Sequence, residues 1–296
     1  MNYFVLLQEK IREMAIIIAD SGSTKTHWAI VGDDGKVTFE ETPGINPVHM
    51  SEEEIKSNHN WLSPWAPNFV SQFPILNSQL EVRFYGAGCV APFSEKVEKA
   101  LKDIYPNADI FVGSDMLGAA RALFGDKEGI ACILGTGSNS CLYDGRDIVK
   151  NIPPLGYVLG DEGSGAVLGK LFFNALFKGF LPEEIKEEYL REEHLSYAEI
   201  IDRVYRQPLA NRFLASTSRF IASHLDCEPL RDIVKENLRA FIRRNVKQYR
   251  RDDLDVGIVG SIAYVYKSEF LEVAREEGVN ISNIVKSPIE LLVKRL

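Results

Sequence analysis

The sequence predicts an α/β protein made of two similar halves. Two apolar strands, residues 15–19 and 129–134, each run into a turn of small polar residues and then into a second strand. Other strands alternate with helical patterns, which is typical of α/β domains. The chain has 296 residues, enough for two domains with separate cores. We therefore expect an internally duplicated fold whose two turns face one another.

The first strand–turn–strand unit carries polar groups suited to phosphate. The apolar strand 15–19 ends at Asp20, and the turn Ser21-Gly22-Ser23-Thr24 follows before strand 26–31. Backbone amides and hydroxyls in such a turn can face an anion, and a carboxylate beside them can hold the accompanying divalent cation. The alternative interpretation is an ordinary hairpin turn rich in Ser and Gly. A P-loop is excluded, because that motif needs G-x-x-x-x-G-K-[ST] before a helix.

Composition narrows the function classes. The net charge of −8 argues against a general nucleic-acid binder. No apolar run approaches the roughly 20 residues needed to span a bilayer, so we expect no membrane association. Residues 1–13 contain several charges and no small-residue cleavage site, so we interpret them as a dispensable extension and not a secretory signal. Cys89, Cys132, Cys141 and Cys227 form no C-x-x-C pair, which predicts buried reduced thiols and a cytoplasmic location.

Two further polar positions lie in the first half. Asn46 sits in the turn-rich loop 42–47, either as a turn former or as an amide facing a polyhydroxyl ligand. Asp115 follows strand 109–113 and precedes a helix over 117–123. The carboxyl ends of strands are where open α/β sheets bind ligands. The alternative is that Ser114 or Asp115 only caps the helix.

The second half repeats the design. The turn Gly135-Thr136-Gly137-Ser138 joins two strands, and a third glycine-rich segment holds the adjacent acids Asp161 and Glu162 before a helix at about 166–177. We expect the chain to be helical throughout residues 182–250, serving as scaffold without chemistry. A buried strand, 255–259, then exits through Gly260-Ser261 into a helix over 262–277, and a strand near 281–285 and a helix begun by Pro288 close the chain.

These loops together resemble the actin–sugar kinase–heat-shock chaperone superfamily, and within it the N-acetylglucosamine kinase branch and the related BadF/BadG/BcrA/BcrD ATPase family. The resemblance runs from Met14 to about Pro288. It rests on residues 20–26 and 134–139 as the two phosphate motifs, 160–164 as a segment distinctive of acetylhexosamine kinases, and 259–261 at the adenosine motif. The chain departs from the usual pattern in three places. Ser21 and Ser23 replace glycines, the adenosine motif has a single glycine followed by serine, and a common tryptophan is replaced at or near Leu155.

The resemblance implies a fold and a division of the chain. The expected fold is two duplicated ribonuclease-H-like (actin-like ATPase) domains with a cleft between them. The first would span residues 14–125, with the C-terminal helix 288–296 as a candidate addition. The second would span residues 126–287 and contain the helical insertion. The implied activity is phosphoryl transfer from ATP to a hydroxyl of an amino sugar or N-acetylhexosamine.

The resemblance also implies roles for the singled-out residues. Asp115 would be the catalytic base, and Asp20 would hold Mg²⁺. Sugar hydroxyls would contact Asn46, Asp115 and Asp161, with Glu162 assisting. The nucleotide would be bound by Ser21, Gly22, Ser23, Thr24, Lys25, Gly135, Thr136, Gly137, Ser138, Gly260 and Ser261.

Two rival functions remain open on the sequence. An ATPase activator of a radical dehydratase would need cysteines that share an iron–sulfur cluster across a dimer, and Cys132 and Cys141 lie on what look like paired strands. A non-catalytic sugar or nucleotide sensor would use the same pocket. The sequence names neither the sugar nor the hydroxyl, and leaves the oligomeric state open, with a homodimer as one candidate.

Overall fold

The computed structural model describes residues 14–22, 24–59 and 79–296. The chain forms two compact units, one ending at Ala122 and including Pro288–Leu296, the other comprising Leu123–Ser287. The expected extension, residues 1–13, and Ser23 of the first turn lie outside the described residues.

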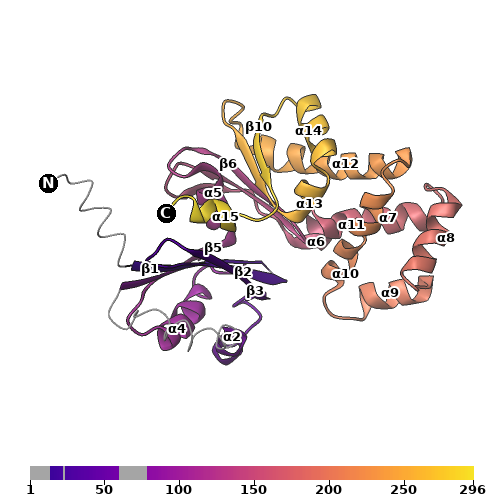
Figure 1. Ribbon diagram of the computed structural model, residues 1–296. Coiled ribbons are helices and arrows are strands. Elements are labelled where there is room, and N and C mark those ends of the chain that lie inside the picture. Colours follow the sequence, from indigo (N-terminus) through magenta and orange to yellow (C-terminus); the bar gives the residue numbers. More distant parts are fainter. Residues whose placement is uncertain (1–13, 23, 60–78) are drawn as a thin grey trace. The chain divides into compact units, whose positions relative to one another are not determined.

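The first unit is built on a five-stranded sheet in the order β3-β2-β1-β4-β5 (Figure 1). Strands β1 to β3 form an antiparallel meander, and β4 and β5 add to it in parallel with β1. The strand bounds are β1 (Met14–Ser21), β2 (Lys25–Val31), β3 (Val37–Pro43), β4 (Gln79–Gly86) and β5 (Asp109–Ser114).

Helices cover both faces of this sheet because its strands are apolar on both sides (Figure 1). Ile17 and its neighbours pack with α2 (Glu52–His59) and α4 (Ser94–Ile104). Ile18, on the opposite face, packs with α5 (Asp115–Phe124) and α15 (Ile289–Val293). Successive residues of a strand point to opposite faces, so a nearly continuous apolar run is what a doubly covered strand requires.

The second unit repeats the first topology. Its sheet has the order β10-β9-β6-β7-β8, again an antiparallel meander extended by two parallel strands. The strands are β6 (Gly129–Leu134), β7 (Ser138–Tyr143), β8 (Ile148–Asn151), β9 (Val256–Val259) and β10 (Ile281–Val285). Five strands in the same order and the same directions confirm the predicted duplicated α/β fold.

The helical part of the second unit differs from the prediction in one place. Residues 182–250 form a series of helices, as predicted, whereas a later helix is divided. The predicted helix 262–277 breaks at Tyr266, whose buried side chain donates a hydrogen bond to the Ser218 carbonyl at 2.7 Å. The helices are α6 (Gly156–Leu159), α7 (Gly165–Phe177), α8 (Glu183–Glu192), α9 (Tyr197–Tyr205), α10 (Ala210–Ser216), α11 (Ser218–Ser223), α12 (Glu228–Arg244), a 3₁₀ turn (Val246–Tyr249), α13 (Ser261–Val265) and α14 (Lys267–Glu276).

Candidate active site

Strand register brings the polar residues of the first unit to one edge of its sheet. Ser21 pairs with Gly86 across β1 and β4, and Gly86 pairs with Ser114 across β4 and β5. All three strands are parallel, so Asp20 and Asp115 lie at the same carboxyl edge. Two strand spacings separate their backbones by roughly 10 Å, close enough for the carboxylates to influence one another.

Ser114, and not Asp115, provides the side-chain cap of helix α5. The Ser114 hydroxyl accepts a hydrogen bond from the Leu117 amide at 3.2 Å, three residues on, as an N-cap does. The Asp115 Oδ1 accepts from the adjacent Met116 amide at 2.8 Å. Burial, reinforced by the negative charge of Asp20, raises the pKa of Asp115 to about 6. Ser114 therefore makes the cap, and the role of Asp115 as a catalytic base stays a prediction.

Ser21 has a different position from the one predicted for a phosphate ligand. Its hydroxyl is fully buried, donates to the Ile45 carbonyl at 3.1 Å and accepts from the Ile45 amide at 2.9 Å. It also contacts the Thr26 hydroxyl at 2.7 Å. Ser21 therefore tethers the loop that carries Asn46 and is not directed at a ligand.

Asn46 acts as a turn former in the structure. Its Oδ1 accepts a hydrogen bond from the Val48 amide at 3.1 Å. The same oxygen lies 2.5 Å from where a Cβ on Gly88 would stand, so the loop packs tightly on the turn after β4. This arrangement places Asn46 beside the carboxyl end of β4. That strand lies between β1, which carries Asp20, and β5, which directly precedes Asp115.

The first phosphate turn is closed by a hydrogen bond from the Gly22 amide to the Lys25 carbonyl at 2.9 Å. Thr24 is exposed, and its carbonyl accepts from the Gly44 amide at 3.0 Å. The Lys25 ammonium pairs with Glu41 of β3 at 2.6 Å and so lies along the sheet. The backbone angles at Gly22 are ordinary, so the conformational freedom expected of this glycine is not used.

His27 joins the first unit's polar edge, although sequence reasoning did not single it out. It pairs in register with Asp20 on β1 and with Glu41 on β3. Its Nδ1 lies 3.9 Å from Asp20 Oδ2, and its Nε2 lies 3.4 Å from Glu41 Oε2. The contact with Asp20 raises the pKa of His27. The register of the β1–β2 hairpin, which sets His27 opposite Asp20, was the signal that could have placed it.

The second phosphate turn is fastened to the start of helix α7. The Gly135 amide donates to the Gly137 carbonyl at 2.9 Å, which closes the turn. The Gly165 amide donates to the Gly135 carbonyl at 2.9 Å, and the Ala166 amide donates to the Thr136 carbonyl at 3.1 Å. A Cβ added to Gly135 would meet nothing within 4 Å, so the space above this residue is open.

Asp161 lies against this second turn. Its Oδ1 accepts from the Ser138 amide at 3.4 Å, and its Oδ2 lies 3.0 Å from where a Cβ on Gly137 would stand. Burial raises the pKa of Asp161, while the Ser138 amide opposes that rise. The neighbouring Glu162 turns toward α12, where it pairs with Arg244 at 2.9 Å. Of the two predicted sugar ligands in this segment, only Asp161 faces the phosphate turn.

Gly260 lies beside the start of the second turn. A Cβ at Gly260 would stand 2.1 Å from the Leu134 carbonyl oxygen, and the residue has a φ of +125°. Its amide donates to the Val285 carbonyl at 3.0 Å, which ties it to β10. Ser261, which begins α13, is exposed. The chain therefore brings the predicted adenosine motif next to the second phosphate turn.

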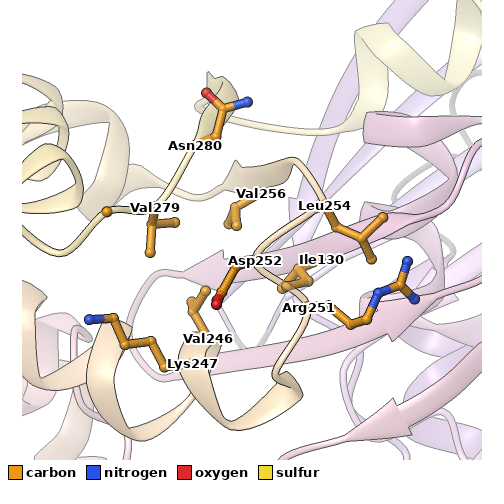
Figure 2. Close-up of a pocket in the computed structure, with 10 residues that line it drawn as sticks. Ile130, Val246, Lys247, Arg251, Asp252, Leu254, Val256, Val279 and Asn280 are labelled. Atoms are coloured by element: carbon orange, nitrogen blue, oxygen red, sulfur yellow. The ribbon is translucent and has the colours of Figure 1, made fainter.

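A separate small pocket lies at the other end of the second sheet. Figure 2 shows its lining residues, among them Ile130 near the start of β6, Val256 at the start of β9 and Asn280 just before β10. The Gly135 turn follows the opposite end of β6. This pocket is therefore remote from the phosphate turn of its own unit.

The carboxylates of the first unit fit a divalent cation that brings ligands of its own. Burial raises the pKa of Asp115 and the negative charge of Asp20 adds to that rise, and a cation relieves such repulsion between carboxylates. Among the described residues, no group of three or more His, Cys, Asp or Glu side chains could hold a metal ion. Mg²⁺ commonly binds through one or two carboxylates together with substrate phosphates.

The helices in the described part of the chain include none long and apolar enough to cross a membrane.

Comparison with known proteins supplies the family. The chain is 46% identical to a candidate N-acetylglucosamine kinase from Porphyromonas gingivalis, whose crystal structure it matches with a TM-score of 0.88 over 95% of this chain and 98% of that one. The chain belongs to the N-acetylglucosamine kinase-like family. It is also 26% identical over 216 residues to an N-acetylmuramic acid/N-acetylglucosamine kinase from Clostridium acetobutylicum, covering 70% of each protein. No family model matches the chain.

The fold of this N-acetylglucosamine kinase-like protein is shared more widely. A candidate N-acetylglucosamine kinase from Chromobacterium violaceum matches with a TM-score of 0.71 at 17% identity, over 96% of this chain and 99% of that one. Such a likeness supports the actin-like sugar kinase fold. In this chain the buried Ser21 hydroxyl provides the tether to Ile45 described above.

Proposed function

We propose that this protein is an ATP-dependent sugar kinase that phosphorylates a hydroxyl of an amino sugar or N-acetylhexosamine. The observation that carries the proposal is Asp115, a carboxylate at the carboxyl edge of the sheet whose pKa is raised to about 6 and whose helix is capped by another residue. A base with such a pKa is mostly ionised at neutral pH yet more basic than an ordinary aspartate, which suits general-base catalysis. The names of its relatives support the substrate class.

In the proposed reaction, Asp115 accepts the proton of the attacking sugar hydroxyl while the oxygen bonds to the γ-phosphorus and ADP leaves. Phosphoryl transfer depends mainly on positioning and charge neutralisation. Asp20 would hold Mg²⁺ at the same edge, where the bound ion supplies positive charge to the phosphate oxygens. His27, beside Asp20, limits the directions in which that carboxylate can turn.

The two turns would bind the phosphates of ATP through different groups. In the first unit, the exposed Thr24 remains a candidate donor, whereas the Ser21 hydroxyl is occupied by Ile45. In the second unit, the open space above Gly135 leaves room for a phosphate close to the backbone. Gly260, packed on the Leu134 carbonyl, would place the nucleoside beside this turn.

Asp161 and the side-chain amide nitrogen of Asn46 would provide the sugar contacts, while the Asn46 oxygen holds the Val48 amide and Asp161 accepts from the Ser138 amide. Asp161 also affects how phosphate binds. A carboxylate beside the second turn repels phosphate unless a cation or a proton neutralises it. A sugar hydroxyl donating to Asp161 is compatible with its position, since Ser138 supplies only one long hydrogen bond at 3.4 Å.

The activator of a radical dehydratase is disfavoured by the positions of two cysteines. Cys132 pairs with Ser140 and Ala131 pairs with Cys141, so the two thiols point to opposite faces of the sheet. Both cysteines are fully buried, and burial raises the pKa of each thiol. An iron–sulfur cluster shared with a second chain needs accessible thiolates on one surface. Neither cysteine meets that need.

The test of the proposal is a coupled ADP-release assay over N-acetylglucosamine, N-acetylmuramate, glucosamine and glucose. We expect sugar-dependent ADP release, highest with an N-acetylated sugar. ATP with Mg²⁺ should also raise the melting temperature by mass action, and a chelator should remove most of that rise. A protein that binds nucleotide and sugar but releases no ADP with any of the four would be a sensor, and the kinase proposal would fail.

A further inference from the structure

One face of helix α12 contacts residues 162–164, the segment that precedes helix α7. Asn237, Phe241 and Arg244 are spaced four and three residues apart and therefore share that face. The Asn237 Oδ1 accepts a hydrogen bond from the Gly163 amide at 2.9 Å, and its Nδ2 donates to the Ser164 carbonyl at 3.1 Å. Both ends of the Asn237 amide, which is only 2% exposed, are thus used on two consecutive residues.

The two other residues of this face hold the same segment. Phe241 lies so close to Gly163 that a Cβ on the glycine would stand 2.7 Å from the phenylalanine Cβ. Gly163 has a φ of +80°, which favours glycine as well. Arg244 pairs with Glu162 at 2.9 Å on the solvent side. Three consecutive residues of the segment are therefore each fixed by α12.

The segment that α12 contacts is continuous with the residues that hold the second turn, Gly135–Ser138, in place. Directly after Ser164, the Gly165 and Ala166 amides donate to the Gly135 and Thr136 carbonyls. Directly before Glu162, the Asp161 carboxylate lies against the other end of the turn. The segment contains several glycines and has little side-chain mass of its own, so an outside partner is needed to fix its position.

We propose that Asn237 is a positioning residue for the nucleotide phosphates, acting through residues 161–166 on the Gly135–Ser138 turn. This inference rests on the proposed function, since it concerns how that kinase holds ATP. The path is short and consists of hydrogen bonds: Asn237 to Gly163 and Ser164, and the next two amides to the turn. A displacement of about 1 Å at a reacting group can reduce the rate by about a hundredfold, so a residue that fixes the turn can govern turnover without touching substrate.

The inference gives α12 a part in catalysis, where the sequence predicted only scaffold. A purely structural hydrogen bond would lower stability and leave ligand affinity unchanged in the molecules that remain folded. A positioning residue changes the affinity for nucleotide in folded molecules. The two are separated by comparing Asn237→Ala with Val234→Ala, a truncation at a fully buried residue of the same helix that belongs to the apolar core.

The experiment measures ADP affinity by calorimetry, at a temperature where each variant is folded by circular dichroism. We expect Asn237→Ala to weaken ADP binding by about tenfold or more, and Val234→Ala to change it by less than about twofold despite a similar fall in melting temperature. Hydrogen exchange should speed up at the Gly165 and Ala166 amides in Asn237→Ala and not in Val234→Ala. Equal ADP affinity for Asn237→Ala and the wild type, or equal losses in both variants, would overturn the inference.

Two further variants decide the matter if Asn237→Ala does not fold. Asn237→Ser keeps a neutral polar group at this buried position but is too short to bond both Gly163 and Ser164. Arg244→Met removes the outer ion pair at a side chain that is 71% exposed, so the fold should survive. Both should weaken ADP binding by about two- to fivefold, and unchanged affinity in both would overturn the inference. Wild-type protein that binds no ADP at all would instead remove the proposed function.

Discussion

His27 lies directly across from Asp20 in the β1–β2 hairpin, with its Nδ1 3.9 Å from the Asp20 Oδ2. Glu41, on the next strand, contacts the other ring nitrogen at 3.4 Å. The imidazole therefore stands between two carboxylates on one face of the sheet. The two neighbouring carboxylates, Asp20 first and then Glu41, explain why the pKa of His27 is raised despite the opposing effects of burial and of Lys25.

The first prediction is a pH-dependent contribution of His27 to stability. Because its pKa is raised in the folded state, the protonated imidazole stabilises the fold. That contribution is fully present below the ordinary value of 6.5 and is lost as pH rises through the folded-state pKa. His27→Leu should therefore lose more stability at about pH 5.5 than at about pH 8.5. The effect should stay below about 1 kcal/mol, because the side chain is 38% exposed and solvent screens the pair.

Denaturant titrations at the two pH values measure this difference. A His27→Leu variant whose stability loss is independent of pH would contradict the ion-pair interpretation.

The second prediction separates catalysis from capping at the start of α5. Asp115→Asn removes the base, so turnover should fall by about 10²- to 10⁴-fold, while ADP binding survives. Ser114→Ala removes the cap that the Leu117 amide uses, so it should cost about 1 kcal/mol of stability and leave turnover nearly unchanged. Steady-state kinetics and thermal denaturation of both variants test the pair. Wild-type turnover in Asp115→Asn would remove this residue from the catalytic role.

The third prediction is the pH dependence of the reaction. The pKa of Asp115 is about 6, so the fraction of enzyme with an ionised base falls as pH drops through that value. The kcat/KM should therefore decrease on the acidic side with an apparent pKa near 6, and be flat from there toward neutrality. The profile is measured with N-acetylglucosamine at limiting and at saturating Mg²⁺. The value near 6 applies at limiting Mg²⁺, and a cation bound beside Asp20 should move the midpoint to lower pH at saturating Mg²⁺.

The fourth prediction compares two glycines of the second unit. A methyl group at Gly135 meets no atom within 4 Å, so Gly135→Ala should fold normally and yet raise the KM for ATP, because the methyl occupies the open space above the turn. Gly260→Ala would place a Cβ 2.1 Å from the Leu134 carbonyl oxygen at a φ of +125°, so it should lower stability by about 2 kcal/mol or more. Melting curves and ATP kinetics distinguish the two. An unchanged KM in Gly135→Ala would mean that phosphate does not approach this residue.

Local sequence patterns were sufficient for the architecture and for the position of Asp115 between a strand and a helix. Apolar runs ending in small polar turns predicted both meanders, since burial on two faces leaves a continuous apolar signature that needs no knowledge of partners. Asp115 was found in the same way, as a carboxylate between a strand and a helix. The sequence left open whether Ser114 or Asp115 makes the cap, because both have suitable side chains.

Tertiary structure decided which distant segment each polar side chain is bonded to. Ser21 carries a suitable oxygen atom, but the packing of the loop after β3 turns its hydroxyl onto Ile45, whereas the Asn46 oxygen is held by the Val48 amide in a local turn. Asn237 sits in a helix with an ordinary amphipathic pattern, and only packing brings it to Gly163. Hydrophobic periodicity reports whether a residue is buried, whereas its hydrogen-bond partner depends on which distant segment the fold places opposite it. Asn237 obtains its partners because the fold places α12 next to residues 161–166, although the two segments are far apart in the chain.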